Sequence, residues 1–255
     1  MRVSEETMAQ QQEKCAGVLG GMGPDATVDF MNRLIRLVDA KEDNDHIRCI
    51  VDNNPKVPSR IKALFEGGQE DPAPCLMDMA RRLEAWGADF LVMPCNTAHY
   101  YHEQIQSAVR IPVLDMIRLT ARAARQKFPQ LRKAGILATS ATVRVGLYEK
   151  AFGELGIATL YPDEPDQAGL LALIKSIKAG QIGEAQRAAL IAAGRRVMEK
   201  GAQALVLACT ELSVIAPQKD ELPFVDASQA LAEETFAIVK QGKATPPYPS
   251  ADSLP

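Results

Sequence analysis

The chain has 255 residues, a formal net charge of -3 and 47% hydrophobic residues, the composition of a globular protein with one large core or two smaller ones. Its basic residues are scattered, so we expect no binding to nucleic acid or to a membrane, and we predict a small-molecule partner. No apolar run reaches the roughly 20 residues of a membrane span. Residues 1–14 are polar and lack the apolar core of a signal peptide, which predicts a cytoplasmic protein.

Short apolar runs alternate along the chain with longer segments of helical period, a pattern typical of parallel sheets with crossover helices. The expected strands are residues 16–20, 47–52, 90–93, 113–115, 134–138, 158–161, 204–208 and 224–226. The expected helices are one that begins after Pro24 and others at 73–86, 97–109, 116–127, 144–155, 167–179, 184–200 and 227–240. The predicted fold class is therefore α/β.

The motifs of the first half recur in the same order in the second half. Ala16-Gly-Val-Leu-Gly20 matches Ala134-Gly-Ile-Leu-Ala138, and Ile111-Pro-Val-Leu-Asp115 matches Leu222-Pro-Phe-Val-Asp226. Such order indicates a duplicated α/β unit. We therefore predict two pseudo-symmetric domains, each a parallel sheet flanked by helices, with the active site in the cleft between them.

The end of the chain is expected to cross back between these domains. We assign residues 15–114 together with 223–240 to the first domain and residues 115–222 to the second. Residues 1–14 and 241–255 are predicted to be flexible termini, since the last segment is rich in Pro, Ser, Ala and Gly.

Five cysteines, an odd number with no CxxC pair, argue against a disulfide framework and a structural zinc site. A lone cysteine is more often packing than chemistry, and we interpret Cys15, Cys49 and Cys75 in that way. Cys95 and Cys209 differ because each directly follows a predicted buried strand, where ligands of parallel sheets bind. A helix that starts there is expected to lower the pKa of the thiol, and the repeated context favours a functional pair.

Two loops are candidate anion sites. The turn Gly20-Gly-Met-Gly-Pro-Asp-Ala-Thr27 is neither a GxGxxG motif nor a phosphate-binding P-loop, so a carboxylate fits it better than a nucleotide. Arg60 follows a strand end in a loop stiffened by two prolines and is either a carboxylate ligand or a solvated surface residue. His99 is expected to support the site near Cys95. No cluster of residues suggests a metal site.

Three motifs resemble the aspartate/glutamate racemase family: Gly20-Gly-Met-Gly-Pro24, Pro94-Cys-Asn-Thr-Ala-His99 and Ala208-Cys-Thr-Glu211. The resemblance extends over about residues 16–240. Glutamate racemases usually have an Asp-Ser-Gly turn and a histidine after the second Cys-Thr, so this chain is more similar to the aspartate racemase branch. The resemblance implies an isomerase, a cofactor-independent racemase of aspartate and/or glutamate or of a broader range of amino acids, usually a homodimer.

The resemblance also implies roles for individual residues. Cys95 and Cys209 form the acid/base pair: one thiolate removes the α-proton, and the other thiol protonates the opposite face of the carbanion. Glu211 is expected to hold the substrate ammonium, and Asn96 and Thr97 its α-carboxylate. The substrate-contacting positions, matched by motif, are Met22, Arg60, Asn96, Thr97, Thr210 and Glu211.

One position departs from this pattern. Some aspartate racemases have a lysine near the substrate, early in the helix that follows the strand at 158–161. Here that stretch reads Gln167-Ala-Gly-Leu-Leu171, and Lys175 comes at least one turn later. The sequence therefore leaves open whether the protein binds a side-chain carboxylate as those enzymes do.

Two alternatives differ in function. Related cysteine enzymes isomerise maleate, racemise hydantoins or decarboxylate malonates, but the turn at Gly20 and the Asn96-Thr97 pair disfavour them. A non-enzymatic redox sensor would close two facing thiols into a disulfide. Replacement of each cysteine by serine separates the sensor from the racemase.

Overall fold

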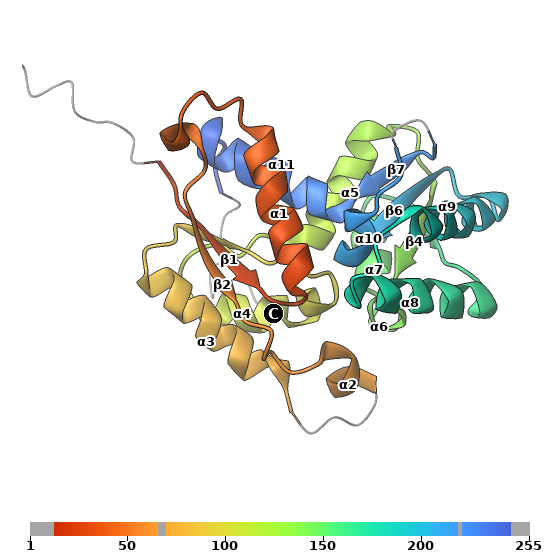
Figure 1. Cartoon of the computed structure of the whole chain (residues 1–255), viewed down its shortest axis with the longest axis horizontal. Helices are drawn as coiled ribbons and strands as arrows, with labels where there is room; N and C mark the ends of the chain where they lie inside the picture. Colours follow the sequence, from red (N-terminus) through yellow and green to blue (C-terminus); the bar gives the residue numbers. More distant parts are fainter. Residues whose placement is uncertain (1–12, 66–69, 219–220, 246–255) are drawn as a thin grey trace, which may run out of the picture.

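The computed structural model describes residues 13–65, 70–218 and 221–245, and shows two separate parallel sheets flanked by helices (Figure 1). The first sheet has the order β2 (Cys49–Asn53), β1 (Ala16–Gly20), β3 (Phe90–Val92), and the second has the order β5 (Ala158–Leu160), β4 (Lys133–Ala138), β6 (Ala204–Ala208), β7 (Phe224–Asp226). The predicted α/β class is confirmed. We call the first sheet with its helices the first unit, and the second sheet with its helices the second unit.

Helices connect the strands, as parallel pairing requires. In chain order they are α1 (Pro24–Leu37), the 3₁₀ helix η2 (Asp43–Asp45), α2 (Arg60–Phe65), α3 (Pro72–Ala85), the 3₁₀ helix η3 (Thr97–Tyr101), α4 (His102–Ser107), α5 (Met116–Lys127), α6 (Ser140–Arg144), α7 (Leu147–Gly153), α8 (Glu164–Lys178), α9 (Glu184–Glu199), α10 (Thr210–Val214) and α11 (Ala227–Lys240).

Two expected helices are interrupted. The segment 97–109 begins as the 3₁₀ helix η3 before α4 continues it. The segment 144–155 is preceded by α6 and broken at Gly146, whose φ of 66° is left-handed and starts α7 anew. The predicted flexible termini lie largely outside the described residues.

The duplication predicted from the motifs has a physical counterpart in the central strands. A methyl group on Gly17 in β1 would lie 2.6 Å from a methyl carbon of Leu91 in β3. A methyl group on Gly135 in β4 would lie 2.8 Å from a methyl carbon of Leu205 in β6. Each central strand therefore needs glycine at the same point, because a leucine of the neighbouring strand and a second apolar side chain, Ala88 or Val197, occupy that space.

The strand β7 departs from the predicted domain division at residues 224–226, whereas the following helix α11 packs in the core of the first sheet. β7 pairs with β6 in the second sheet, so residues 224–226 do not join the first unit. The repeat explains this pairing. Residues 111–115 of the first half match residues 222–226, and they lie beside β3, where Val113 forms an isolated parallel bridge with Leu91. Residues 113–115, expected to be a strand, form only that bridge.

The helices that follow these two segments pack across the boundary between the units. Ile117 and Ala121 of α5 share a core with Ile136 of β4 in the second unit. Ala227 and Leu231 of α11 share a core with the first sheet. α5 and α11 also pack against each other where the units meet (Figure 1).

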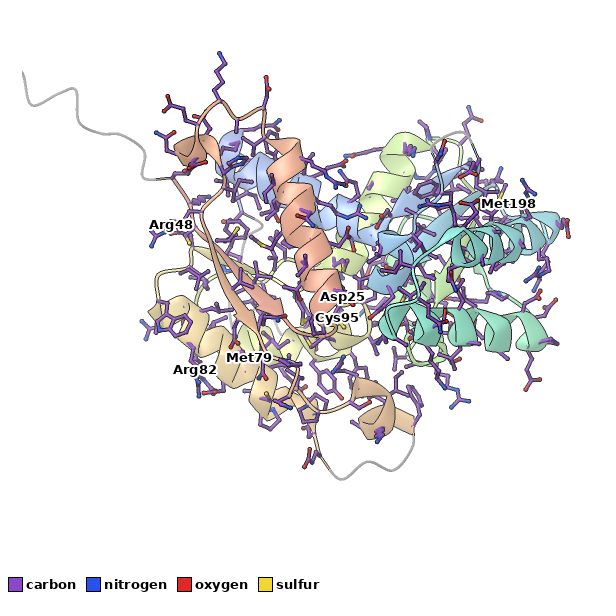
Figure 2. The ribbon with its side chains drawn as sticks, viewed as in Figure 1. Asp25, Arg48, Met79, Arg82, Cys95 and Met198 are labelled. Carbon is purple, nitrogen blue, oxygen red and sulfur yellow. The ribbon has the colours of Figure 1, made fainter. Side chains whose placement is uncertain are left out.

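The exchange of these helices brings together residues that are far apart in the sequence. In the side-chain view of Figure 2, Cys95 lies between the two units, whereas Met198 lies on the outer part of the second unit. The carboxyl ends of β3 and β6 thereby face a common space.

Candidate active site

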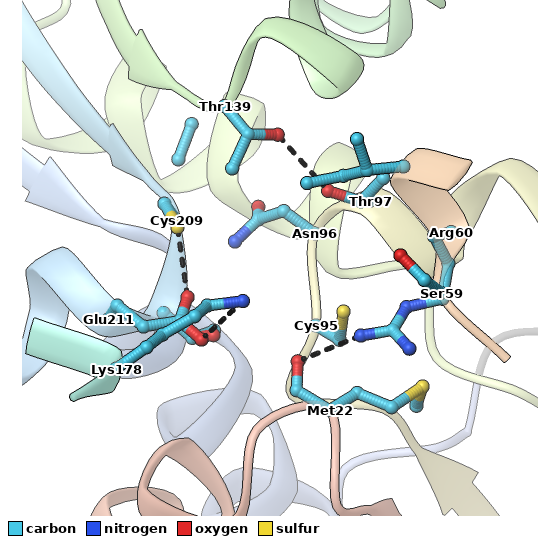
Figure 3. Close-up of a pocket in the computed structure, with 13 residues that line it drawn as sticks. Met22, Ser59, Arg60, Cys95, Asn96, Thr97, Thr139, Lys178, Cys209 and Glu211 are labelled. Atoms are coloured by element: carbon cyan, nitrogen blue, oxygen red, sulfur yellow. Dashed lines mark hydrogen bonds and ion pairs between the residues drawn. The ribbon is translucent and has the colours of Figure 1, made fainter. Parts of the chain in front are cut away.

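A pocket with about 450 Å³ of empty space lies between the two units. Residues of the first unit that line it are Met22, Ser59, Arg60, Ile61, Cys95, Asn96 and Thr97, and those of the second are Thr139, Lys178, Ala208, Cys209, Thr210 and Glu211. The structure thus brings together all eight site residues predicted from the sequence. Figure 3 shows Cys209, Glu211 and Lys178 on one side, and Cys95, Arg60 and Met22 on the other.

The backbone of Cys95 is held by the side chain of His99. Cys95 is the third residue after the end of β3, is buried, and its carbonyl oxygen lies 2.9 Å from Nδ1 of His99. The N–H of Met116 donates to Nε2 of the same ring at 3.1 Å, so Nε2 accepts and Nδ1 carries the proton that it donates to Cys95. Burial lowers the pKa of His99, which keeps the ring neutral. His99 therefore supports the strand end that carries Cys95.

Cys209 is the N-cap residue of α10 and is buried at the end of β6. Its Sγ donates to Oε2 of Glu211 at 3.0 Å. Burial raises the pKa of Cys209 well above its usual value, and the charge and hydrogen bond of Glu211 raise it further. The expectation that a helix start lowers the pKa is wrong for Cys209, because one short helix does not offset burial beside a carboxylate.

Lys178 is a charged residue of the pocket that the sequence did not reveal. Its Nζ lies 3.2 Å from Oε1 of Glu211, so one carboxylate contacts both Lys178 and the Cys209 thiol. Burial is the largest single influence and lowers the pKa of Lys178, but Glu211 together with Cys209 and Cys95 outweighs it, and the net shift is upward. Lys178 is therefore a cation in the pocket.

Lys178 was missed because it ends α8, whereas the lysine of some aspartate racemases was expected near the start of that helix. The last turn of α8 packs near α10 and reaches the pocket. Lys175, one turn earlier, does not line the pocket. The two lysines lie on the same face of α8, so the position along the helix, and not the face, places Lys178 in the pocket.

Asn96 and Thr97 of the first unit are held by residues of the second. Oγ1 of Thr97 lies 2.9 Å from Oγ1 of Thr142 and 3.3 Å from that of Thr139. The hydroxyl of Tyr148 donates to Oδ1 of Asn96 at 2.5 Å. The expected contact of Thr97 with substrate therefore competes with a buried cluster of three hydroxyls.

Arg60 lies at the start of α2 and lines the pocket. Its guanidinium donates to the carbonyl oxygens of Pro58 at 3.1 Å and Met22 at 3.5 Å. Among the described residues it forms no ion pair with a carboxylate. Arg60 is therefore positioned by backbone oxygens and keeps its charge available to an anion in the pocket.

The other predicted site residues form the wall of the pocket and do not suggest a metal site. Met22 and Thr210 are buried in the pocket wall, and Gly21 donates its N–H to Oγ1 of Thr27 rather than to the pocket. Within residues 13–65, 70–218 and 221–245, no three His, Cys, Asp or Glu side chains are grouped to hold a metal ion. No helix in this part of the chain is long and apolar enough to span a membrane.

Comparison with known proteins gives consistent matches. The family model of the Asp/Glu/Hydantoin racemases matches residues 19–235. The broad specificity amino-acid racemase RacX of Bacillus subtilis is 29% identical over 228 residues, which are 87% of this chain and 96% of the relative.

Solved structures show the same fold. An aspartate racemase of Picrophilus torridus superposes with a TM-score of 0.76 and 33% identity, over 91% of this chain and 96% of that chain. A glutamate racemase of Francisella tularensis, solved with D-glutamate, has a TM-score of 0.62 and 17% identity over 93% of this chain and 86% of that chain. The chain belongs to the Asp/Glu/Hydantoin racemase family and is an isomerase of the racemase type.

Proposed function

We propose that this protein racemises amino acids without a cofactor, with Cys95 and Cys209 as a pair of acid and base. The observation that carries this proposal is that two thiols, from matching strand ends of two repeated units, line one pocket. Two groups of the same type on opposite faces of an α-carbon serve both directions of the reaction by exchanging their protonation states.

The surroundings of the thiols suggest which one starts as the acid. The Cys209 thiol donates a hydrogen bond to Glu211, and its raised pKa favours the thiol over the thiolate. In one direction Cys95, as thiolate, takes the α-proton, and Cys209 then delivers its own proton to the opposite face of the carbanion. In the reverse direction the roles exchange, so exactly one proton must be present on the pair.

The charges in the pocket support an acidic substrate. Arg60 and Lys178 approach it from opposite units, and each is suited to a carboxylate. Glu211 is the nearest anion for the substrate ammonium, and its present pairing with Lys178 would then be exchanged for substrate groups. We infer that aspartate and glutamate are preferred; a broader range, as the name of the RacX relative suggests, is the alternative. By resemblance to the family we also propose a cytoplasmic homodimer.

The thiol pair predicts that each cysteine is required. Cys95→Ser and Cys209→Ser should each lower kcat/KM by at least about 100-fold, because serine does not ionise at neutral pH. Chiral chromatography across a panel of amino acids measures the rate, and Cys75→Ser, outside the pocket, serves as control. Full activity in both variants would eliminate the two-thiol mechanism. Absence of inversion across the panel in the unaltered protein would remove the racemase proposal.

Lys178 should determine the preference for acidic substrates. Lys178→Met is expected to raise KM for aspartate or glutamate about tenfold, because a charged hydrogen bond to a carboxylate is lost. KM for neutral amino acids should change much less. The ratio of KM for acidic to KM for neutral substrates cancels any effect of the substitution on the thiols. Lys175→Met, one turn earlier on α8, should leave both values unchanged. Equal losses for acidic and neutral substrates would exclude Lys178 as a carboxylate ligand.

Glu211 should govern the alkaline limit of activity. The limit reports loss of the last proton from the thiol pair, and Glu211 raises the pKa of Cys209. In Glu211→Gln the pKa of Cys209 falls, so the alkaline limb of kcat/KM against pH should move to lower pH. Glu199→Gln, exposed at the end of α9, provides the control. An unmoved limb, or one at higher pH, would show that Glu211 does not hold the thiol proton.

A further inference from the structure

Tyr148 lies in α7 of the second unit and is 1% exposed, yet it contacts the residue next to Cys95 in the first unit. Its hydroxyl donates to Oδ1 of Asn96 at 2.5 Å, and Asn96 is itself 3% exposed. The sequence gives no hint of this contact, since Tyr148 lies 52 positions from Asn96. A buried phenol of one unit thus hydrogen-bonds an amide beside the thiol of the other.

This hydrogen bond fixes which end of the Asn96 amide faces the pocket. With Oδ1 occupied by Tyr148, the nitrogen Nδ2 points into the space between Cys95 and Cys209 (Figure 3). Within the described part of the chain, Nδ2 is a buried donor with no hydrogen-bond partner. Buried donors are rarely left unpaired, so Nδ2 is suited to an acceptor supplied by a ligand.

The Tyr148 hydroxyl favours the observed orientation of the Asn96 amide, because Oδ1 accepts the proton that the phenol donates. Burial raises the pKa of Tyr148, so the phenol keeps the proton that it donates. Thr139 and Thr142, which belong to the second unit like Tyr148, also hydrogen-bond Thr97. These contacts hold the backbone next to Asn96 in place.

We propose that Tyr148 is a positioning residue that holds Nδ2 of Asn96 as a donor to the substrate α-carboxylate. The inference rests on the proposed racemisation, in which loss of the α-proton makes that carboxylate enediolate-like and more negative. A donor fixed in advance stabilises this charge without reorganisation at the moment of reaction. Tyr148 therefore acts through Asn96 and does not touch the substrate.

Removal of the hydroxyl tests the role of Tyr148. In Tyr148→Phe the amide is free to turn, and kcat should fall about tenfold with a smaller change in KM, because the donor acts mainly on developing charge. Tyr161→Phe is the matched control, since Tyr161 packs against the same core cluster outside the pocket. If Tyr148→Phe and Tyr161→Phe have the same kcat, the inference is wrong.

Two Asn96 variants separate positioning from a tether between the units. Asn96→Asp keeps an acceptor for Tyr148 but removes the donor, so kcat should fall about 100-fold with the unfolding midpoint retained. Asn96→Ala and Asn96→Ala/Tyr148→Phe should have kcat values within about twofold of each other, because Tyr148 acts only through Asn96. Full activity in Asn96→Asp, or additive losses in the double variant, would overturn the proposal.

A spectroscopic measurement keeps the inference separate from racemisation. The side-chain amide pair of Asn96, assigned in a ¹H–¹⁵N spectrum as the pair missing from Asn96→Asp, should shift in Tyr148→Phe and not in Tyr161→Phe. Succinate, a dicarboxylate that cannot be racemised, should shift the pair in the unaltered protein. These shifts would support the positioning role even if no amino acid is inverted, and their absence would refute it.

Discussion

The constraint on which the rest of the structure depends is that two separate sheets must present their carboxyl ends to one pocket. The helices α5 and α11 meet it by packing across the unit boundary. A buried ion pair between Arg33 of α1 and Asp226 at the start of α11, with N–O distance 3.0 Å, joins the two units at the same place. Arg33 also donates to the carbonyl oxygen of Ser213 in α10, the helix that carries Glu211. The relative position of the two thiols is therefore tied to these packed helices, and not to loops alone.

The two units place their thiols symmetrically in the pocket, but the residues around Cys95 differ from those around Cys209. Cys209 lies beside a carboxylate that is paired with Lys178, whereas the backbone of Cys95 is held by the neutral ring of His99. In the proposed mechanism this difference favours Cys209 as the thiol that starts protonated, since burial beside a negative charge opposes ionisation. Arg60 lies in one wall of the pocket and Lys178 in the other, and the proposed preference for a substrate with two carboxylates rests on this arrangement.

The sequence predicted much of this pocket because the signals that locate its two cysteines are local. Strands that end in Cys95 and Cys209, and the repeat that relates them, are visible in short strings, and periodicity located α5 and α11 closely. The misses depend on tertiary packing. Lys178 reaches the pocket only because of where the last turn of α8 lies, and Tyr148 only because α7 lies against the strand end of the other unit.

The error in the domain division has a related cause. Residues 224–226 were assigned by the expected course of the chain, but their pairing with β6 follows from the repeat itself. The short helices α2 and α6 were not expected, and α10 was expected only as a helix start at Cys209 without bounds, because five or six residues are too few for a helical period to be recognised. The pKa of Cys209 was predicted in the wrong direction, because burial and the contact with Glu211 are properties of the folded chain.

The fate of the α-proton tests the two-thiol account most directly. Racemisation is started from one pure enantiomer of aspartate or glutamate in deuterated water and stopped at low conversion. The two enantiomers are then separated, and the deuterium content of each is measured by mass spectrometry. If one thiol removes the proton and the other delivers a solvent-derived one, the product carries deuterium at the α-carbon while the remaining starting enantiomer keeps protium. Equal labelling of the two enantiomers, or a product that retains the original proton, would contradict the assignment of Cys95 and Cys209 as separate base and acid.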